Sequence, residues 1–271
     1  MRSSWLALVS MLALSLSLHA QQSPQNAPQA PPVPATQPLD LRNPLDNLLL
    51  QWEEKMKAVD TLKATITRTT TDKTFRTRDT FQGYAYYMQP NRALLHLQKG
   101  TGNNVSFERF VCTGNYLYVY HQATRQLRYH ALPPPKPGQI ADDNFLSFLF
   151  GMRAEEAKRR YELKLYPSDK FYHYLEIVPR FDADKADFQK ARLVLNQNTY
   201  LPRELSFLDA AGTQTTWDIT RIEKGVRLEP PQLQQLTKPV LPSGWEYKQM
   251  PRLDQKQTAD VPPRIVRPTK P

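Results

Sequence analysis

The sequence predicts an α+β fold that is mainly β: a curved antiparallel sheet, or open half-barrel, of roughly ten strands. It adds an N-terminal helix and a mid-chain helical lid. Three observations lead to this class. Apolar residues recur every three or four positions in residues 44–59. Beyond them, short runs alternate apolar and polar residues. Brief Gly-, Pro-, Asn- and Asp-rich segments separate these runs, so consecutive strands must be antiparallel.

The helical period predicts an amphipathic helix from about Pro44 to Val59. Asn43 can cap its start, and Pro44 suits the first helical position because its missing N–H is not needed there. The apolar side is formed by Leu45, Leu48, Leu49, Trp52 and Met56.

The stretch "DDNFLSFLFGMRAEEAKRRYEL" interrupts the strand pattern, and it predicts two short helices from about Asp143 to Arg160. Its apolar residues are candidates for a lid over the sheet. They are equally compatible with ordinary core beneath a helix. The lid candidates are Phe145, Phe148 and Leu149.

The first twenty residues have the features of a cleavable secretory signal peptide. One basic residue, Arg2, precedes an apolar run that ends at Leu18, too short for a membrane-spanning helix. We expect cleavage after Ala20 and export to the periplasm or another exported location. No cysteine lies near this site, so we expect no lipid anchor. The alternative is an uncleaved anchor helix.

Composition divides the rest of the chain into three parts. Residues 21–43 are rich in Pro and Gln and predict a disordered linker. Residues 44–250 carry the periodic segments and are long enough for one domain. Residues 251–271 form a basic, Pro-rich tail.

A long meander curls, and its inner face becomes a cavity unless large side chains fill it. Such a cavity suits an apolar ligand. Aromatic residues on strands are more often packing residues, and the inward face cannot be fixed because a one-residue slip exchanges the two faces. The cavity candidates are Ile66, Tyr84, Tyr86, Leu95, Leu97, Leu117, Val119, Leu175, Ile177, Leu193, Leu195, Trp217 and Ile219.

Several segments, taken in chain order, resemble the LolA/LolB-like family of periplasmic lipoprotein carriers. They are "QGYAYYMQPNRALLHL", "FVCTGNYLYVYHQATRQL", "FLSFLFG", "YLEIVPR" and "ARLVLNQNTYLPRELSFLDAAGTQTTWDITRIEKG". The exported, proline-rich form is also similar to an uncharacterised planctomycete group with this domain. The resemblance covers residues 44–250. It implies a half-barrel lidded by helices that binds acyl chains or acylated proteins transiently and performs no chemistry.

One position departs from the family pattern. Where the carriers that pass lipoproteins have a latch arginine before the proline, this chain has Gln89. Lipoprotein transfer is therefore in question. The alternatives are an envelope sensor or interaction protein of the same fold, and an enzyme on a curved sheet.

The sequence offers no support for a metal site, a cofactor or a catalytic group. The histidines after residue 20 fall on separate predicted strands: His96, His121, His130 and His173. The run "DADKAD" at 182–187 lacks the Gly and Glu of a calcium loop, so we expect a solvated hairpin tip. Cys112 lies in an apolar strand-like run and is expected to be buried rather than reactive.

The net charge of +10 suggests acidic partners. The basic residues are spread along strands, and an exported protein rarely meets nucleic acid, so we expect no nucleic-acid partner. Anionic lipid or lipopolysaccharide head groups fit better. The alternative is a charge that serves solubility alone. We expect a monomer.

Overall fold

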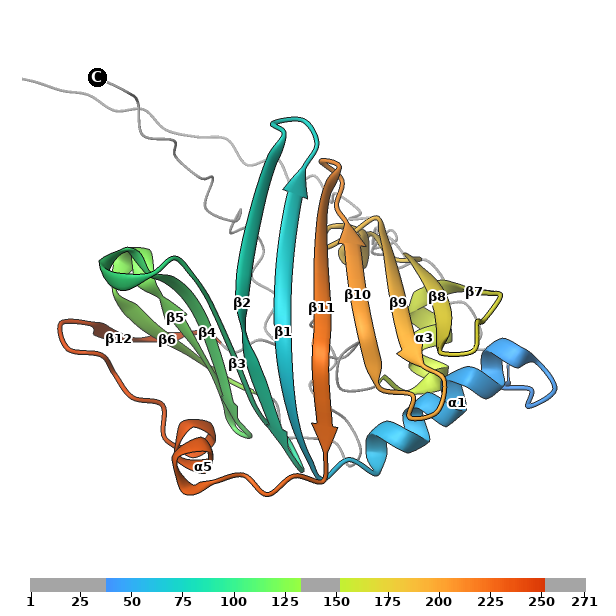
Figure 1. The fold of residues 1–271 in the computed structure, drawn as a ribbon, viewed down its shortest axis with the longest axis horizontal. Coiled ribbons are helices and arrows are strands. Elements are labelled where there is room, and N and C mark those ends of the chain that lie inside the picture. The colour runs from blue at the N-terminus through green and yellow to red at the C-terminus, as the bar shows by residue number, and fades with distance from the viewer. Residues whose placement is uncertain (1–37, 133–151, 252–271) are drawn as a thin grey trace, which may run out of the picture. The chain divides into compact units, whose positions relative to one another are not determined.

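The computed structural model describes residues 38–132 and 152–251, all within one compact unit, Thr36–Pro271. Their strands form one open sheet in the order β12-β6-β5-β4-β3-β2-β1-β11-β10-β9-β8-β7 (Figure 1). All neighbouring strands pair antiparallel except β12 and β6, which are parallel. The predicted class, a mainly β fold with a curved antiparallel sheet, is confirmed.

The chain builds the sheet outward from its centre. It runs from β1 to β6 on one side, then forms β7 at the far edge and returns to β11 beside β1. The strands are β1 (Thr61–Asp72), β2 (Thr77–Met88), β3 (Arg92–Lys99), β4 (Ser106–Thr113), β5 (Tyr116–His121), β6 (Gln126–Ala131), β7 (Tyr161–Tyr166), β8 (Tyr172–Pro179), β9 (Lys190–Asn196), β10 (Pro202–Leu208), β11 (Thr213–Lys224) and β12 (Glu246–Met250).

Four α-helices accompany the sheet in the described residues: α1 (Pro44–Lys57), α3 (Ala154–Arg160), α4 (Asp182–Lys185) and α5 (Pro230–Thr237). The start of α1 is as predicted. The Asn43 Oδ1 accepts a 2.9 Å hydrogen bond from the Leu45 N–H, and Pro44 begins the helix. These contacts satisfy N-terminal N–H groups that the helix itself cannot pair.

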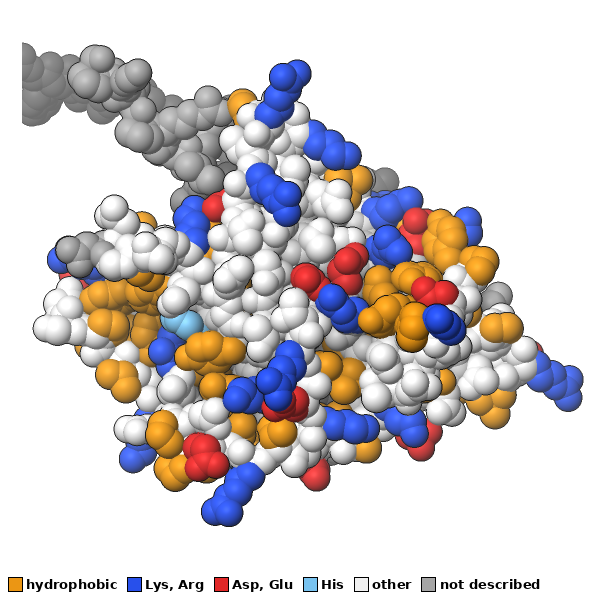
Figure 2. Space-filling view, in the orientation of Figure 1, with side chains coloured by type: hydrophobic (Ala, Val, Ile, Leu, Met, Phe, Trp, Pro, Cys, Tyr) orange, Lys and Arg blue, Asp and Glu red, His pale blue; other side chains and the backbone are white. Residues whose placement is uncertain are grey.

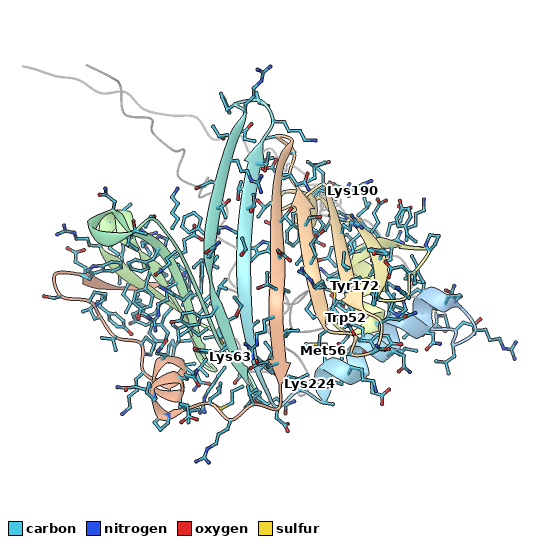
Figure 3. The ribbon with its side chains drawn as sticks, viewed as in Figure 1. Trp52, Met56, Lys63, Tyr172, Lys190 and Lys224 are labelled. Carbon is cyan, nitrogen blue, oxygen red and sulfur yellow. The ribbon has the colours of Figure 1, made fainter. Side chains whose placement is uncertain are left out.

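The sheet buries apolar side chains on both faces. The face that α1 covers, called here the α1 face, carries Leu62, Ala64 and Ile66, which pack with Trp52 and Met56 of the helix. Figure 3 labels Trp52 and Met56 on α1. The other side, called the opposite face, carries a second cluster in which Leu94 and Val111 pack with Leu236 of α5. Adjacent residues of one strand can therefore both be buried, as Leu94 and Leu95 are.

Three details differ from the sequence expectations. The described sheet has twelve strands, because β12 was not predicted and β4 occupies the strand-like run around Cys112. The predicted helices at 143–160 are represented by α3, and the remainder lies outside the described residues. The run 182–187 joins the antiparallel strands β8 and β9 and is mostly exposed, as expected of a hairpin tip, but it contains α4, and Asp184 is buried against Arg160, at 2.5 Å from Nη2 to Oδ1.

Candidate functional site

The cavity candidates do not lie on one surface. Tyr84 and Tyr86 lie on the opposite face, in the cluster that includes α5. Most of the others are buried on the α1 face within the α1 cluster: Ile66, Leu95, Leu97, Leu175, Ile177, Leu193, Leu195, Trp217 and Ile219. Leu117 and Val119 are the two candidates that are half-buried on the α1 face.

Strand register places Leu117 and Val119 beside a third apolar residue. Phe110 on β4 is directly opposite Leu95 on β3 and Val119 on β5. Directly paired residues share a face of the sheet. Phe110, Leu117 and Val119 therefore form one apolar surface on the α1 face, called here the β4–β5 strip. All three are only half-buried.

The helices of the α1 face lie against the other half of the sheet. In Figure 1, α1 and α3 accompany the β7–β10 side. Among residues 38–132 and 152–251, no helix covers the α1 face of β4–β6 in this view. The α1 core thus continues at its β4–β5 end into apolar side chains that stay partly accessible.

Basic groups border the strip on β6. Arg128 is directly opposite Val119, and His130 is opposite Leu117. The Arg128 Nε donates a 3.0 Å hydrogen bond to the Gln126 side chain, and no acidic side chain of the described residues forms an ion pair with it. A half-buried guanidinium beside apolar side chains can attract an anionic group to this edge.

A charged pair borders the strip along β4. Glu108 precedes Phe110 by two residues, so both side chains project from the same face, roughly 7 Å apart along the strand. Its carboxylate receives two hydrogen bonds from Arg68, at 2.5 and 2.7 Å. The Arg68 guanidinium also lies over the Phe81 ring, 4.7 Å from its centroid. The arrangement is a bidentate pair held against an aromatic surface.

Side-chain hydrogen bonds fix the helices around this face. The Glu53 carboxylate of α1 accepts a 2.8 Å hydrogen bond from the Ala154 N–H at the start of α3. Gln89, at the position of the expected latch arginine, donates a 2.8 Å hydrogen bond from Nε2 to the carbonyl of Lys57 at the end of α1. Gln89 therefore contacts α1 without an ionic group.

The described residues contain one Ser–His pair, Ser168 and His173, with 2.7 Å between Oγ and Nδ1. The His173 Nε2 has no hydrogen-bond partner in this part of the chain, so no carboxylate orients the ring as a triad requires. In the same residues, no group of three or more His, Cys, Asp and Glu side chains is placed to hold a metal ion.

Sequence reasoning missed Phe110, Glu108 and Arg128. The alternation in "ERFVC" places Glu108, Phe110 and Cys112 on one face of a strand, which is a usable signal. The register that places Phe110 on one side of Val119 and Arg128 on the other depends on pairing across three strands and is not encoded in any local pattern.

No family model and no curated protein matches the chain. The comparison with solved structures finds chains of low sequence identity. An uncharacterized conserved protein from Thermus thermophilus is 13% identical, with a TM-score of 0.46 over 75% of this chain and 98% of that chain. A LolA superfamily protein from Nitrosomonas europaea is 12% identical, with a TM-score of 0.36 over 70% of this chain and 96% of that chain.

The complex of MucA and MucB from Pseudomonas aeruginosa contains a third similar chain. It is 14% identical, with a TM-score of 0.42 over 70% of this chain and 60% of that chain. A LolA superfamily protein is among these matches, at 12% identity.

Proposed function

We propose that the protein is an exported, non-catalytic binder or carrier of acylated or lipidic ligands, with the acyl chain on the β4–β5 strip. The observation that carries the proposal is the half-buried state of Phe110, Leu117 and Val119 at the edge of an otherwise closed apolar core. Apolar side chains left partly accessible beside such a core favour an apolar occupant.

The charged groups beside the strip support a ligand with a polar end. Arg128 suits an anionic head group such as a carboxylate or a phosphate. This fits the partners expected from the sequence, which include acyl chains, acylated proteins and anionic lipids.

Export rests on residues 1–20, which lie outside the described residues. Among the helices that the structure describes, none has the length and apolar character needed to cross a membrane. The lid candidates Phe145, Phe148 and Leu149 also lie outside the described residues and remain predictions.

The test is titration of the purified protein with a dansyl-labelled fatty acid. Leu117→Lys and Val119→Lys place a charge in the strip at half-buried positions, and each should weaken binding at least about tenfold. Thr65→Lys is the matched control, because Thr65 is an exposed β1 residue. Leu95 and Leu195 are unsuitable positions, since both are core residues whose replacement by lysine would unfold the protein.

Circular dichroism of each variant separates loss of binding from loss of folding. If Leu117→Lys and Val119→Lys are folded and bind the probe as tightly as Thr65→Lys does, the strip is not the binding site. If the unmodified protein does not bind the probe, the proposed function itself fails.

A further inference from the structure

The opposite face of the sheet holds a pocket that the lipid proposal does not use. Its volume is about 680 Å³, within the range of small-molecule sites. It lies over β2 and β3, where Tyr84 is directly opposite His96 and Gln82 is directly opposite Gln98. The lining of the pocket therefore includes these two cross-strand pairs, and Thr80 and Thr101 extend it.

The floor of the pocket is aromatic. The rings of Tyr84 and His96 are half-buried, with centroids 5.4 Å apart. The aromatic surface continues from His96 to Phe107 and from Phe107 to Trp245, with 6.0 Å between centroids in each case. Gln82, Gln98 and the two threonines are exposed around this floor.

The side chains that project into the pocket carry no formal charge. Lys99 borders the pocket, but its ammonium is bound by Asp79 at 2.8 Å and lies over the Phe81 ring, which belongs to the α1 face. Burial first, and then the nearby Arg109, lower the pKa of His96, against a smaller opposing effect of Gln98. The imidazole is therefore neutral at pH 7.

The guanidinium of the nearby Arg109 contacts groups outside the pocket. Arg109 donates a 3.4 Å hydrogen bond to the side chain of Gln235 on α5, and its guanidinium lies over the Tyr120 ring. The same Gln235 oxygen accepts a hydrogen bond from the Tyr84 hydroxyl at 3.2 Å. Tyr84 is thus held in place by α5. Figure 2 shows this face, where a mostly white surface with a few Lys and Arg side chains lies over the middle strands, between hydrophobic areas over β4–β6 and β8–β9.

We infer that this pocket binds a neutral saccharide. A sugar ring presents C–H groups on its faces and hydroxyl groups around its rim. The C–H faces can lie on the Tyr84 and His96 rings, whose π surfaces are electron-rich. The rim hydroxyls can exchange hydrogen bonds with Gln82 and Gln98, because an amide both donates and accepts. The one charged residue of the lining, Lys99, is already paired with Asp79, so the pocket favours a neutral ligand over a charged one.

The experiment is a titration of the full chain with defined hexasaccharides, followed by calorimetry and saturation-transfer NMR. Cellohexaose, maltohexaose and chitohexaose are the neutral probes, and hexagalacturonate is the anionic comparison. At least one neutral probe should bind at concentrations up to about 10 mM, and hexagalacturonate should bind more weakly.

Variants then locate the site. Tyr84→Ala should weaken binding by about tenfold, whereas Tyr84→Phe keeps the ring and should change it by less than about threefold. Gln98→Ala alters an exposed side chain and should weaken binding by about threefold to tenfold without affecting the fold. Ser206→Ala, on β10, is the control and should leave binding unchanged.

Three outcomes would overturn the inference. They are no neutral probe bound, binding of hexagalacturonate alone, and neutral binding that Gln98→Ala and Tyr84→Ala leave unchanged. The inference is independent of the lipid proposal, because the strip and the pocket occupy different faces and their variants do not overlap.

Discussion

The carboxylate of Asp46 on α1 lies 2.8 Å from the Lys158 ammonium on α3, and Asp46 is only 2% exposed. The Asp46 Oδ2 also accepts a 2.9 Å hydrogen bond from the Asp40 backbone N–H. The pair joins two helices that are more than a hundred residues apart in the chain. It therefore connects the N-terminal helix to the helix before β7.

Replacing Asp46 by Asn should lower the free energy of unfolding by about 1–3 kcal/mol. The substitution keeps the shape of the side chain but leaves the Lys158 ammonium, which is 20% exposed, without its counter-charge. Urea unfolding followed by circular dichroism measures the change.

Asp79→Asn is the matched control, because the Asp79–Lys99 pair is exposed at 49% and 42%. It should change stability by less than about 1 kcal/mol. Equal losses for the two variants would show that the buried pair does not stabilise the helix contact.

Glu53 makes the free energy of unfolding depend on pH. Burial raises the pKa of its carboxyl, but hydrogen bonds from the Ala154 N–H and Lys57, with the charges of Lys57 and Arg153, outweigh it and leave the pKa below its usual 4.5. The unfolded state then binds the proton more readily. This contribution is present above pH 4.5 and is lost as the pH falls below that value.

The check is urea unfolding of the unmodified protein and of Glu53→Gln between pH 3 and pH 7, a range of about four units around the carboxyl pKa values. The difference in stability between the two proteins should shrink as the pH falls. A difference that stays constant across the range would mean that the Glu53 charge does not contribute.

The sequence predicts α1 well because its signals are local. Asn43, Pro44 and the spacing of Leu48, Trp52 and Met56 each act within a few residues, and all are found as expected. The strand alternation likewise predicts most of the sheet.

The assignment of faces could not be predicted. Tyr84 and Tyr86 have the same alternation as any cavity residue, yet they lie on the opposite face, where side chains of α5 hydrogen-bond to both hydroxyls. The α5 segment follows them by more than a hundred residues, so no local pattern relates the two. Likewise, β12 is mostly exposed and is defined by its parallel pairing with β6 rather than by apolar periodicity.

Cys112 should react slowly. Burial raises the pKa of its thiol, against a smaller opposing hydrogen bond from Gly114, and Sγ donates to the carbonyl of Asn91 at 3.0 Å. Burial and the hydrogen bond to Asn91 both favour the protonated thiol, which is a poor nucleophile. Modification by dithionitrobenzoate at pH 8 should be at least about tenfold slower in the folded protein than in denaturant.

The experiment also reports on the strip. Cys112 is directly opposite Leu117, so it lies on the same face as the β4–β5 strip. Equal rates in the folded and unfolded states would show that solvent reaches this part of β4 freely. The β4–β5 strip would then be too exposed to solvent to bind an acyl chain.

The proposed function requires a lipid bound on the α1 face of the sheet. Native mass spectrometry of the protein, purified from the envelope of cells that make it, tests this most directly, with lipids extracted from the same sample. We expect a bound species at close to one molecule per chain that extracts as a lipid or an acylated peptide. A mass equal to that of the protein alone, with no uptake of added fatty acid, would contradict it.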